Sequence, residues 1–141
     1  MDILVTGARG GIATAIAQHF VKHNLYLPTR QDMDVCSLDS IQSYLELIPN
    51  IDLLINNAGD LYSASIKDSV PDKWLNDINV NFVGTYLTTQ ALLKKYDNVK
   101  VINIASAAAY RSYKEWSSYC ASKAAVVTLT KCLANEGEEA Y

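Results

Sequence analysis

The chain has 141 residues, of which 50% are hydrophobic and 19% are charged, and its formal net charge is −3. This length suits one globular domain that spans residues 1–141, and the composition excludes an intrinsically disordered chain. Lys and Arg form no block, so the sequence lacks the basic surface that nucleic acid or an anionic membrane requires, and we expect neither partner.

Short apolar runs alternate with segments of helical periodicity along the chain. The apolar runs predict strands at 3–5, 25–27, 51–55 and 99–104. The periodic segments predict helices at 11–20, 41–48, 71–92 and 118–135. Alternation of apolar strands with helices is typical of an open parallel sheet, so we predict an α/β fold.

The region after the second predicted strand is short. Only a few residues separate Thr29 from Asp34 and Val35, whereas a parallel crossover needs a dozen or more. We therefore expect the helix after the second strand to be missing and any strand that follows it to be vestigial.

A glycine-rich segment, TGARGGIA at positions 6–13, lies between the first strand and the first helix. Glycines in such a turn let the backbone approach a pyrophosphate, and the N–H groups at the start of the helix face its charge. The segment predicts a dinucleotide site whose contacts are Gly7, Arg9, Gly10, Gly11 and Ile12. The alternative interpretation is an ordinary flexible turn.

The pattern Tyr-x-x-x-Lys occurs three times, as Tyr96/Lys100, Tyr110/Lys114 and Tyr119/Lys123. Only the last pair lies within a predicted helix, where a spacing of four places both side chains on one face. Ser106 follows a predicted strand and stands thirteen residues before Tyr119. Both observations favour Tyr119 and Lys123 as the functional pair.

This trio of residue types suits proton transfer to a carbonyl or alcohol. A tyrosine, whose ordinary pKa is about 10, exchanges protons near neutral pH only when a neighbouring cation stabilises its phenolate. Lys123 can supply that cation. Ser106 can donate a hydrogen bond to the reacting oxygen and stabilise the charge that develops there.

The glycine turn, the segment NNAG at positions 56–59 and the Ser/Tyr/Lys trio together resemble the short-chain dehydrogenase/reductase family, with Ala13 in place of the last glycine of the turn. The resemblance implies a Rossmann-like, doubly wound parallel sheet in three layers and hydride transfer between a nicotinamide and a carbonyl or secondary alcohol. It implies that the catalytic residues are Asn81, Ser106, Tyr119 and Lys123. Further implied cofactor contacts are Asp34, Val35, Asn57, Ala58, Gly59, Tyr119 and Lys123.

Two of these roles come from the resemblance alone. Lys123 is expected to hold the ribose hydroxyls of the nicotinamide, and Asn81 to complete a proton relay through water. A solvent-exposed polar residue is the alternative interpretation of Asn81. The family resemblance also implies a homodimer or homotetramer.

The residue after the second strand indicates which cofactor is preferred. An acidic residue there accepts the ribose hydroxyls of NAD(H), whereas a basic one pairs with the 2′-phosphate of NADP(H). Arg30 stands in this place, Arg9 can assist it, and positions 29–31 hold no Asp or Glu. We therefore predict NADP(H) rather than NAD(H), with a solvated surface arginine as the alternative for Arg30.

Family members ordinarily continue past the helix that carries Tyr119 into two further strands and a substrate-covering loop. We therefore expect either a fragment or a reduced relative that lacks those last two strands. Two function classes stay open: an oxidoreductase, for example on a 3-oxoacyl thioester or a sugar-like ketone, and a non-catalytic dinucleotide-binding or dimerising module. In the first class, the expected substrate contacts are Tyr110, Arg111, Tyr113 and Trp116.

Location and metal content follow from what the sequence lacks. No signal peptide pattern follows Met1, no apolar stretch approaches bilayer length, and the three cysteines lack paired spacing. We expect a cytoplasmic protein with reduced thiols. His19 and His23 are four residues apart, but no third ligand accompanies them, so we expect surface histidines and no metal site.

Overall fold

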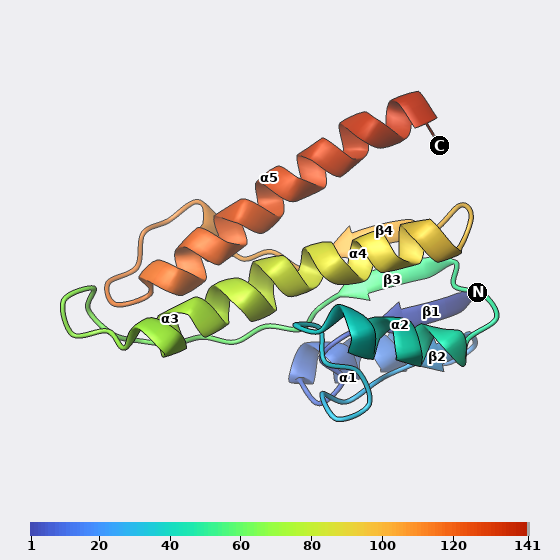
Figure 1. The fold of residues 1–141 in the computed structure, drawn as a ribbon, viewed down its shortest axis with the longest axis horizontal. Helices are drawn as coiled ribbons and strands as arrows, with labels where there is room; N and C mark the ends of the chain where they lie inside the picture. The colour runs from blue at the N-terminus through green and yellow to red at the C-terminus, as the bar shows by residue number, and fades with distance from the viewer. Residues whose placement is uncertain (141) are drawn as a thin grey trace. The chain divides into compact units, whose positions relative to one another are not determined.

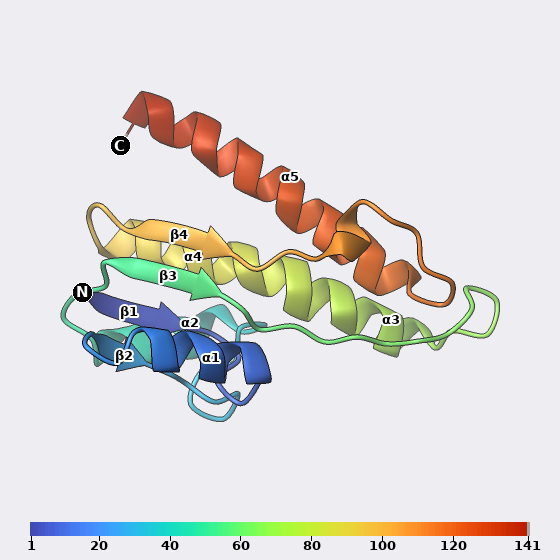
Figure 2. The same cartoon turned by 180° about the vertical axis from the view of Figure 1, so that it is seen from behind.

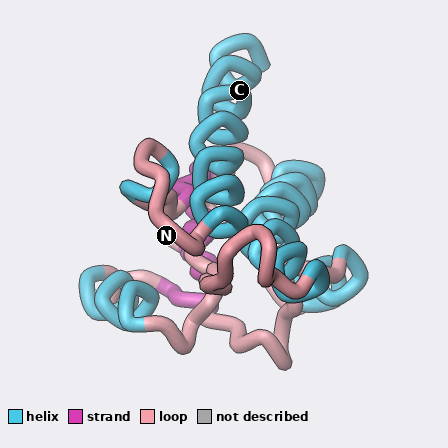
Figure 3. The backbone as a smooth tube through the Cα atoms, turned by 90° about the vertical axis from the view of Figure 1, so that its left-hand side faces the viewer, coloured by secondary structure: helices cyan, strands magenta, loops and turns pink. Residues whose placement is uncertain are grey.

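The structure is a computed structural model that describes the backbone of residues 1–140 and the side chains of residues 1–137. Its helices and strands, shown in Figure 1, are β1 (Asp2–Val5), α1 (Gly11–His19), β2 (Asn24–Tyr26), α2 (Leu38–Glu46), β3 (Leu53–Asn56), α3 (Pro71–Ile78), the π-helix η1 (Asn79–Val83), α4 (Gly84–Lys95), β4 (Lys100–Asn103), the 3-10 helix η2 (Ala107–Ala109) and α5 (Ser117–Ala140). Figure 3 shows how much more of the backbone is helix than strand.

The chain divides into two compact units. Residues 1–58 and 84–104 form the first, which we call the sheet unit, and residues 59–83 and 105–140 belong to the second, the helical unit. Each unit is described by itself below. The expectation that residues 1–141 behave as one domain stays a prediction.

The sheet unit contains four parallel strands in the order β2-β1-β3-β4. Leu4 of β1 pairs with Tyr26 on one side and with Leu54 on the other, and Ile55 of β3 pairs with Ile102 of β4. The two central strands are buried on both faces, which explains why they are apolar without alternation. The predicted parallel α/β sheet is confirmed.

Helices cover both faces of this sheet. Figure 1 shows α2 and α4 in front of the strands, and Figure 2, from behind, shows α1 on the opposite face. Leu4, Leu54 and Leu92 belong to the core cluster under α2 and α4, while Ile3 and Ile55 belong to the cluster under α1. These clusters give the doubly wound arrangement of three layers.

The segment between β2 and α2 contains neither a helix nor a strand, as expected from its length. Turns occupy it instead, and the buried side chain of Met33 anchors it to the core. Ser37 then caps α2, because its side chain accepts a hydrogen bond from the backbone N–H of Ser40.

The predicted helix 71–92 is wrong in one respect. A π-helix of five residues, Asn79–Val83, separates α3 from α4. The i→i+5 hydrogen bonding of a π-helix admits one extra residue into a turn, and such turns are frequent at functional sites. Apolar periodicity does not reveal this change, since it alters the bonding pattern over only one turn.

Candidate active site

The glycine turn after β1 is held by two side chains in the sheet unit. The Thr6 hydroxyl accepts hydrogen bonds from the backbone N–H groups of Asn57 and Ala58, at 3.0 and 2.9 Å. The Asn57 side-chain amide donates to the carbonyl oxygens of Thr6 and Gly7, at 3.0 and 3.3 Å. The ends of β1 and β3 are therefore tied together by these bonds.

Gly7 is required by the backbone itself. Its φ is +70°, and a Cβ atom added there would lie 2.7 Å from the Ala58 Cα. Gly10 and Gly11 differ, because a Cβ on Gly10 would meet only the Gly7 carbonyl oxygen, at 3.5 Å, and one on Gly11 would meet nothing within 4 Å. The space beside Gly10 and Gly11 is therefore open to a ligand.

The amino end of α1 adjoins that open space. Gly10 precedes the helix with an extended backbone, and no side chain caps the first turn. Arg9 and Ile12 are exposed beside it. Uncapped N–H groups at a helix start favour an anion, so this turn can accept a phosphate group.

The loop after β2 places Arg30 on the surface and brings in an acidic group that the sequence prediction missed. The Asp32 carboxylate accepts from the Thr29 backbone N–H at 2.8 Å and from the Thr29 hydroxyl at 2.6 Å. These hydrogen bonds lower the pKa of Asp32, and the bond from the Thr29 hydroxyl has the largest effect. The positive charge of Arg9 lowers this pKa further. A carboxylate therefore lies against Thr29 although residues 29–31 contain none.

Three further predicted cofactor contacts outside the glycine turn are Asp34, Val35 and Gly59. The Asp34 carboxylate accepts from the Cys36 backbone N–H at 2.9 Å, and Val35 packs against the core under α2 and α4. Gly59 is exposed at the start of the helical unit.

All four predicted catalytic residues lie in the helical unit. Asn81 is on η1, Ser106 precedes η2, and Tyr119 and Lys123 are on α5. Helix α5 packs against both η1 and η2. The fold therefore gathers elements that are far apart in the sequence around the first turns of α5.

Asn81 is only 1% exposed, which rules out the solvent-exposed alternative. Its side-chain oxygen accepts from the Asp60 backbone N–H at 2.7 Å, and its amide nitrogen donates to the Asp60 carbonyl at 2.9 Å and to the Ser122 hydroxyl at 3.0 Å. The side chain thus links the loop after β3 to α5. The Ser106 hydroxyl accepts from the Ala108 backbone N–H at 3.1 Å and caps η2.

Lys123 is 5% exposed, and its Nζ lies 5.8 Å from the centre of the Tyr119 ring. Burial lowers the pKa of this amine. The amine thus lies near the ring of the phenol that it is expected to influence, and it is shielded from water, which weakens electrostatic interactions.

In the other two Tyr-x-x-x-Lys pairs, the tyrosine and the lysine do not share a helix. The Tyr96 hydroxyl lies 3.1 Å from the Leu45 carbonyl oxygen and 2.8 Å from that of Ile48, and burial raises its pKa. It joins α2 to the end of α4. Tyr110 is 75% exposed in the loop after η2. Only Tyr119 and Lys123 lie on one helix.

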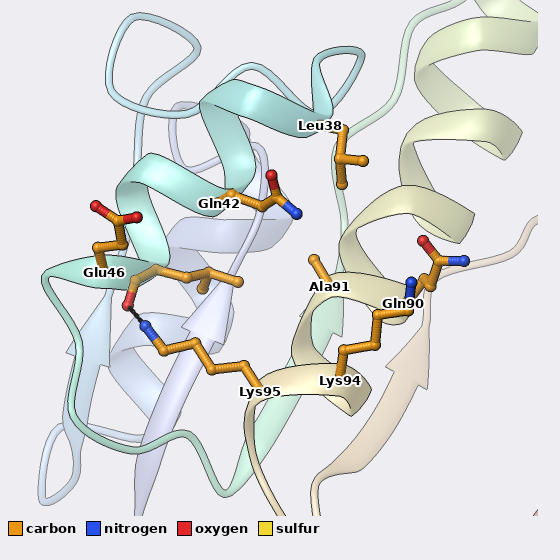
Figure 4. A pocket seen from close by; sticks show the side chains of 8 residues that line it. Leu38, Gln42, Glu46, Gln90, Ala91, Lys94 and Lys95 are labelled. Atoms are coloured by element: carbon orange, nitrogen blue, oxygen red, sulfur yellow. Dashed lines mark hydrogen bonds between the residues drawn. The ribbon is translucent and has the colours of Figure 1, made fainter.

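A hollow of about 300 Å³ lies between α2 and α4 (Figure 4). Its lining includes Gln42, Gln90 and Lys95, and the Lys95 amine donates to the Leu45 carbonyl. None of the residues predicted for the site lines it, so it is separate from the candidate active site.

Comparison with known proteins decides the family. Residues 28–140 match the family described as short chain dehydrogenase. The chain belongs to the short-chain dehydrogenase family.

Relatives within this family include an NAD-dependent glycerol dehydrogenase of Listeria innocua, 28% identical over 160 positions that cover 94% of this chain. An uncharacterized oxidoreductase of Staphylococcus aureus is 33% identical over 132 residues, 89% of this chain. The chain spans 63% and 54% of the lengths of these two relatives.

Two solved dehydrogenase structures have a similar fold. The Thermoplasma acidophilum aldohexose dehydrogenase aligns with a TM-score of 0.83 and 26% identity, over 96% of this chain and 61% of its own. The Escherichia coli serine dehydrogenase aligns with a TM-score of 0.84 and 27% identity, over 96% of this chain and 76% of its own.

Over residues 1–140, no helix has both the length and the apolar character that a bilayer crossing demands. In the described part of the chain, no group of three His, Cys, Asp or Glu side chains is placed to hold a metal ion.

The lowered pKa of Lys123 predicts how its effect on stability changes with pH. Between the lowered pKa and the ordinary value of 10.5, the folded state has released the proton and the unfolded chain has not, so stability rises with pH. We expect the free energy of unfolding of the wild type, minus that of Lys123→Met, to increase from neutral pH towards about 10. Denaturant unfolding at each pH measures it, and a constant difference would contradict the prediction.

Proposed function

We propose that this chain carries the active site of an NADP(H)-dependent oxidoreductase that acts on a carbonyl or secondary alcohol. The observation that carries the proposal is the buried Lys123 amine beside the Tyr119 ring, on a helix that packs against the elements bearing Asn81 and Ser106. Membership of the short-chain dehydrogenase family supports the same chemistry.

In the direction of reduction, Tyr119 donates its hydroxyl proton to the carbonyl oxygen while the carbonyl carbon gains hydride, which yields an alcohol. A nicotinamide held by this chain would supply that hydride. Lys123 stabilises the phenolate that remains, and Ser106 donates a hydrogen bond to the reacting oxygen. Water then returns a proton to Tyr119, along a relay to which we assign Asn81.

We assign cofactor binding to the turn 7–12, to Asn57, Ala58 and Gly59, and to the loop that contains Arg30, Asp34 and Val35. The open space at Gly10 and Gly11 and the uncapped start of α1 support a phosphate position at the turn. We also assign Tyr119 and Lys123 as cofactor contacts, with Lys123 on the ribose of the nicotinamide.

We propose a preference for NADP(H), because the exposed Arg30 and Arg9 can pair with a 2′-phosphate. Two observations stand against this preference. The Asp32 carboxylate lies against Thr29 and would repel a 2′-phosphate, and the Listeria innocua relative is named as NAD-dependent. We expect Arg30→Ala to weaken NADPH binding by about tenfold or more and to leave NADH binding unchanged, since a hydrogen bond to a charged group contributes about 1.5–3 kcal/mol.

Titration followed by nicotinamide fluorescence measures both cofactors. Asp32→Asn is the matched control, since it removes the opposing charge nearby and should strengthen NADPH binding. Tighter binding of NADH than of NADPH to the wild type would overturn the preference.

The loop before α5 provides the proposed substrate contacts, Tyr110, Arg111, Tyr113 and Trp116. The ring centres of Tyr113 and Trp116 are 5.2 Å apart, and those of Trp116 and Tyr119 are 5.9 Å apart, so a row of aromatic side chains leads to the proposed proton donor. A 3-oxoacyl thioester and a sugar-like ketone both suit the chemistry. The names of the glycerol and aldohexose dehydrogenases favour a small hydroxylated substrate.

Oxidation of NADPH with a panel of ketones and aldehydes, followed by nicotinamide absorbance, tests the proposal. Turnover with any member supports it. Cofactor binding without turnover across the panel would instead support a non-catalytic dinucleotide-binding or dimerising module, which the chain's span of 54–63% of its relatives keeps open.

We further propose a cytoplasmic homodimer or homotetramer whose partner molecules are small substrates rather than nucleic acid or membrane. The net charge of −3 and the absence of a basic block support the exclusion of anionic polymers.

A further inference from the structure

Three serine hydroxyls of α5 are hydrogen-bonded to one face of α3 and η1. The pairs and distances are Trp74 Nε1 to Ser117 Oγ at 2.8 Å, Ser118 Oγ to Asp77 Oδ2 at 2.7 Å, and Asn81 Nδ2 to Ser122 Oγ at 3.0 Å. We call these three bonds the serine ladder. All six residues belong to the helical unit.

The ladder follows the geometry of the two elements. Positions 74, 77 and 81 are three and four residues apart, so their side chains lie along one face. Positions 118 and 122 are likewise four apart on α5. Each of these serines directly precedes a proposed catalytic residue, Tyr119 or Lys123. Since successive helical residues differ by about 100° in direction, the direction of the serines determines the direction of the phenol and the amine.

Ser122 also connects the ladder to Tyr119 through the backbone. Its hydroxyl donates to the Tyr119 carbonyl oxygen at 2.9 Å and accepts from Asn81. Asp77 in turn accepts from the Tyr62 backbone N–H at 2.9 Å, which ties the loop after β3 into the same network.

Asp77 is unusual for its burial. It is 1% exposed, Ser118 and Ser122 are fully buried, and within the described residues the second carboxyl oxygen, Oδ1, has no hydrogen-bond partner. A buried carboxyl with one unpaired oxygen is costly, and an apolar side chain of similar volume often stabilises such a position instead. Core packing alone therefore does not explain an aspartate here.

We propose that Asp77, acting through Ser118, is a positioning residue that sets the rotation of α5 and thereby the placement of Tyr119 and Lys123. This inference rests on the proposed function for its effect on turnover. The expected effect of Asp77 on the Lys123 amine does not depend on the proposed function, because that effect follows from the packing of α5 alone.

The test compares Asp77→Leu, which removes the ladder bond, with Asp77→Asn, which keeps a side chain able to bond Ser118. Misplacement of reacting groups by about 1 Å can cost about 100-fold in rate. We expect kcat to fall by about 10- to 100-fold in Asp77→Leu, and Asp77→Asn to restore most of it. Ser118→Ala removes the same bond with a smaller change and serves if Asp77→Leu does not fold.

A second readout, NMR titration of the Lys123 side chain, needs no turnover. Rotation of α5 that exposes the amine would raise its pKa towards 10.5, because burial is what lowers that pKa. We therefore expect a rise in Asp77→Leu and in Ser118→Ala. Thr88→Val is the control. It removes the hydroxyl of Thr88 in α4 of the sheet unit, whose buried oxygen has no hydrogen-bond partner either, and it should leave kcat and the pKa of Lys123 unchanged.

The two readouts separate the two proposals. A raised pKa of Lys123 in a protein that turns over no substrate supports the ladder and contradicts the proposed function. An unchanged Lys123 titration in both Asp77→Leu and Ser118→Ala overturns the positioning role, whatever happens to kcat.

Discussion

Tyr119→Phe is expected to lower kcat by about 100- to 10,000-fold, the contribution that a positioned acid or base usually makes. The substitution removes one hydroxyl and keeps the ring that lies 5.8 Å from the Lys123 amine and beside the Trp116 ring. The helix and its packing should therefore survive. Steady-state turnover of NADPH measures the loss, and fluorescence titration should show that the cofactor still binds.

Tyr96→Phe is a matched control, because Tyr96 also stands four residues before a lysine. Its hydroxyl meets the Leu45 and Ile48 carbonyl oxygens in the sheet unit, so its removal should cost stability, about 1–3 kcal/mol, and leave kcat unchanged. If Tyr119→Phe kept more than about a tenth of the wild-type kcat, another group would have to supply the proton.

Gly7→Ala is expected to destabilise the sheet unit strongly. A φ of +70° costs a residue with a Cβ about 1–2 kcal/mol. The added atom would also lie 2.7 Å from the Ala58 Cα and 3.0 Å from its nitrogen, which are backbone atoms held by the Thr6 hydroxyl, and such overpacking costs about 1–3 kcal/mol more. Denaturant unfolding should show the sum of both effects.

Gly11→Ala separates folding from cofactor binding in the same turn. The new methyl group meets nothing within 4 Å, and the position is the first of α1, so stability should hold or rise by up to about 1 kcal/mol. The methyl group would, however, occupy the space proposed for the phosphate, so cofactor affinity should fall. Equal stability of the Gly7 and Gly11 variants would contradict the role assigned to the backbone of Gly7.

The order of strands and helices, the glycine turn and the placement of Tyr119 and Lys123 on one helix could all be predicted from the amino-acid sequence. Each of these is a local property. Apolar periodicity reports burial over one or two turns, and a spacing of four residues places two side chains on one helical face wherever that helix lies. The length of the segment between β2 and α2 excluded a helix there for an equally local reason, the reach of the chain.

The surroundings of these groups depend on how distant segments pack, which local patterns do not report. The Asp32 carboxylate reaches Thr29 because the loop turns back. Asn81 is buried and bonds Asp60 and Ser122. The π-helix of η1 changes hydrogen bonding without changing apolar spacing. Asp77 and Ser118 are 41 residues apart in the sequence and 2.7 Å apart in space. A hydrogen bond between elements depends on how they pack, and no local pattern of residues records that packing.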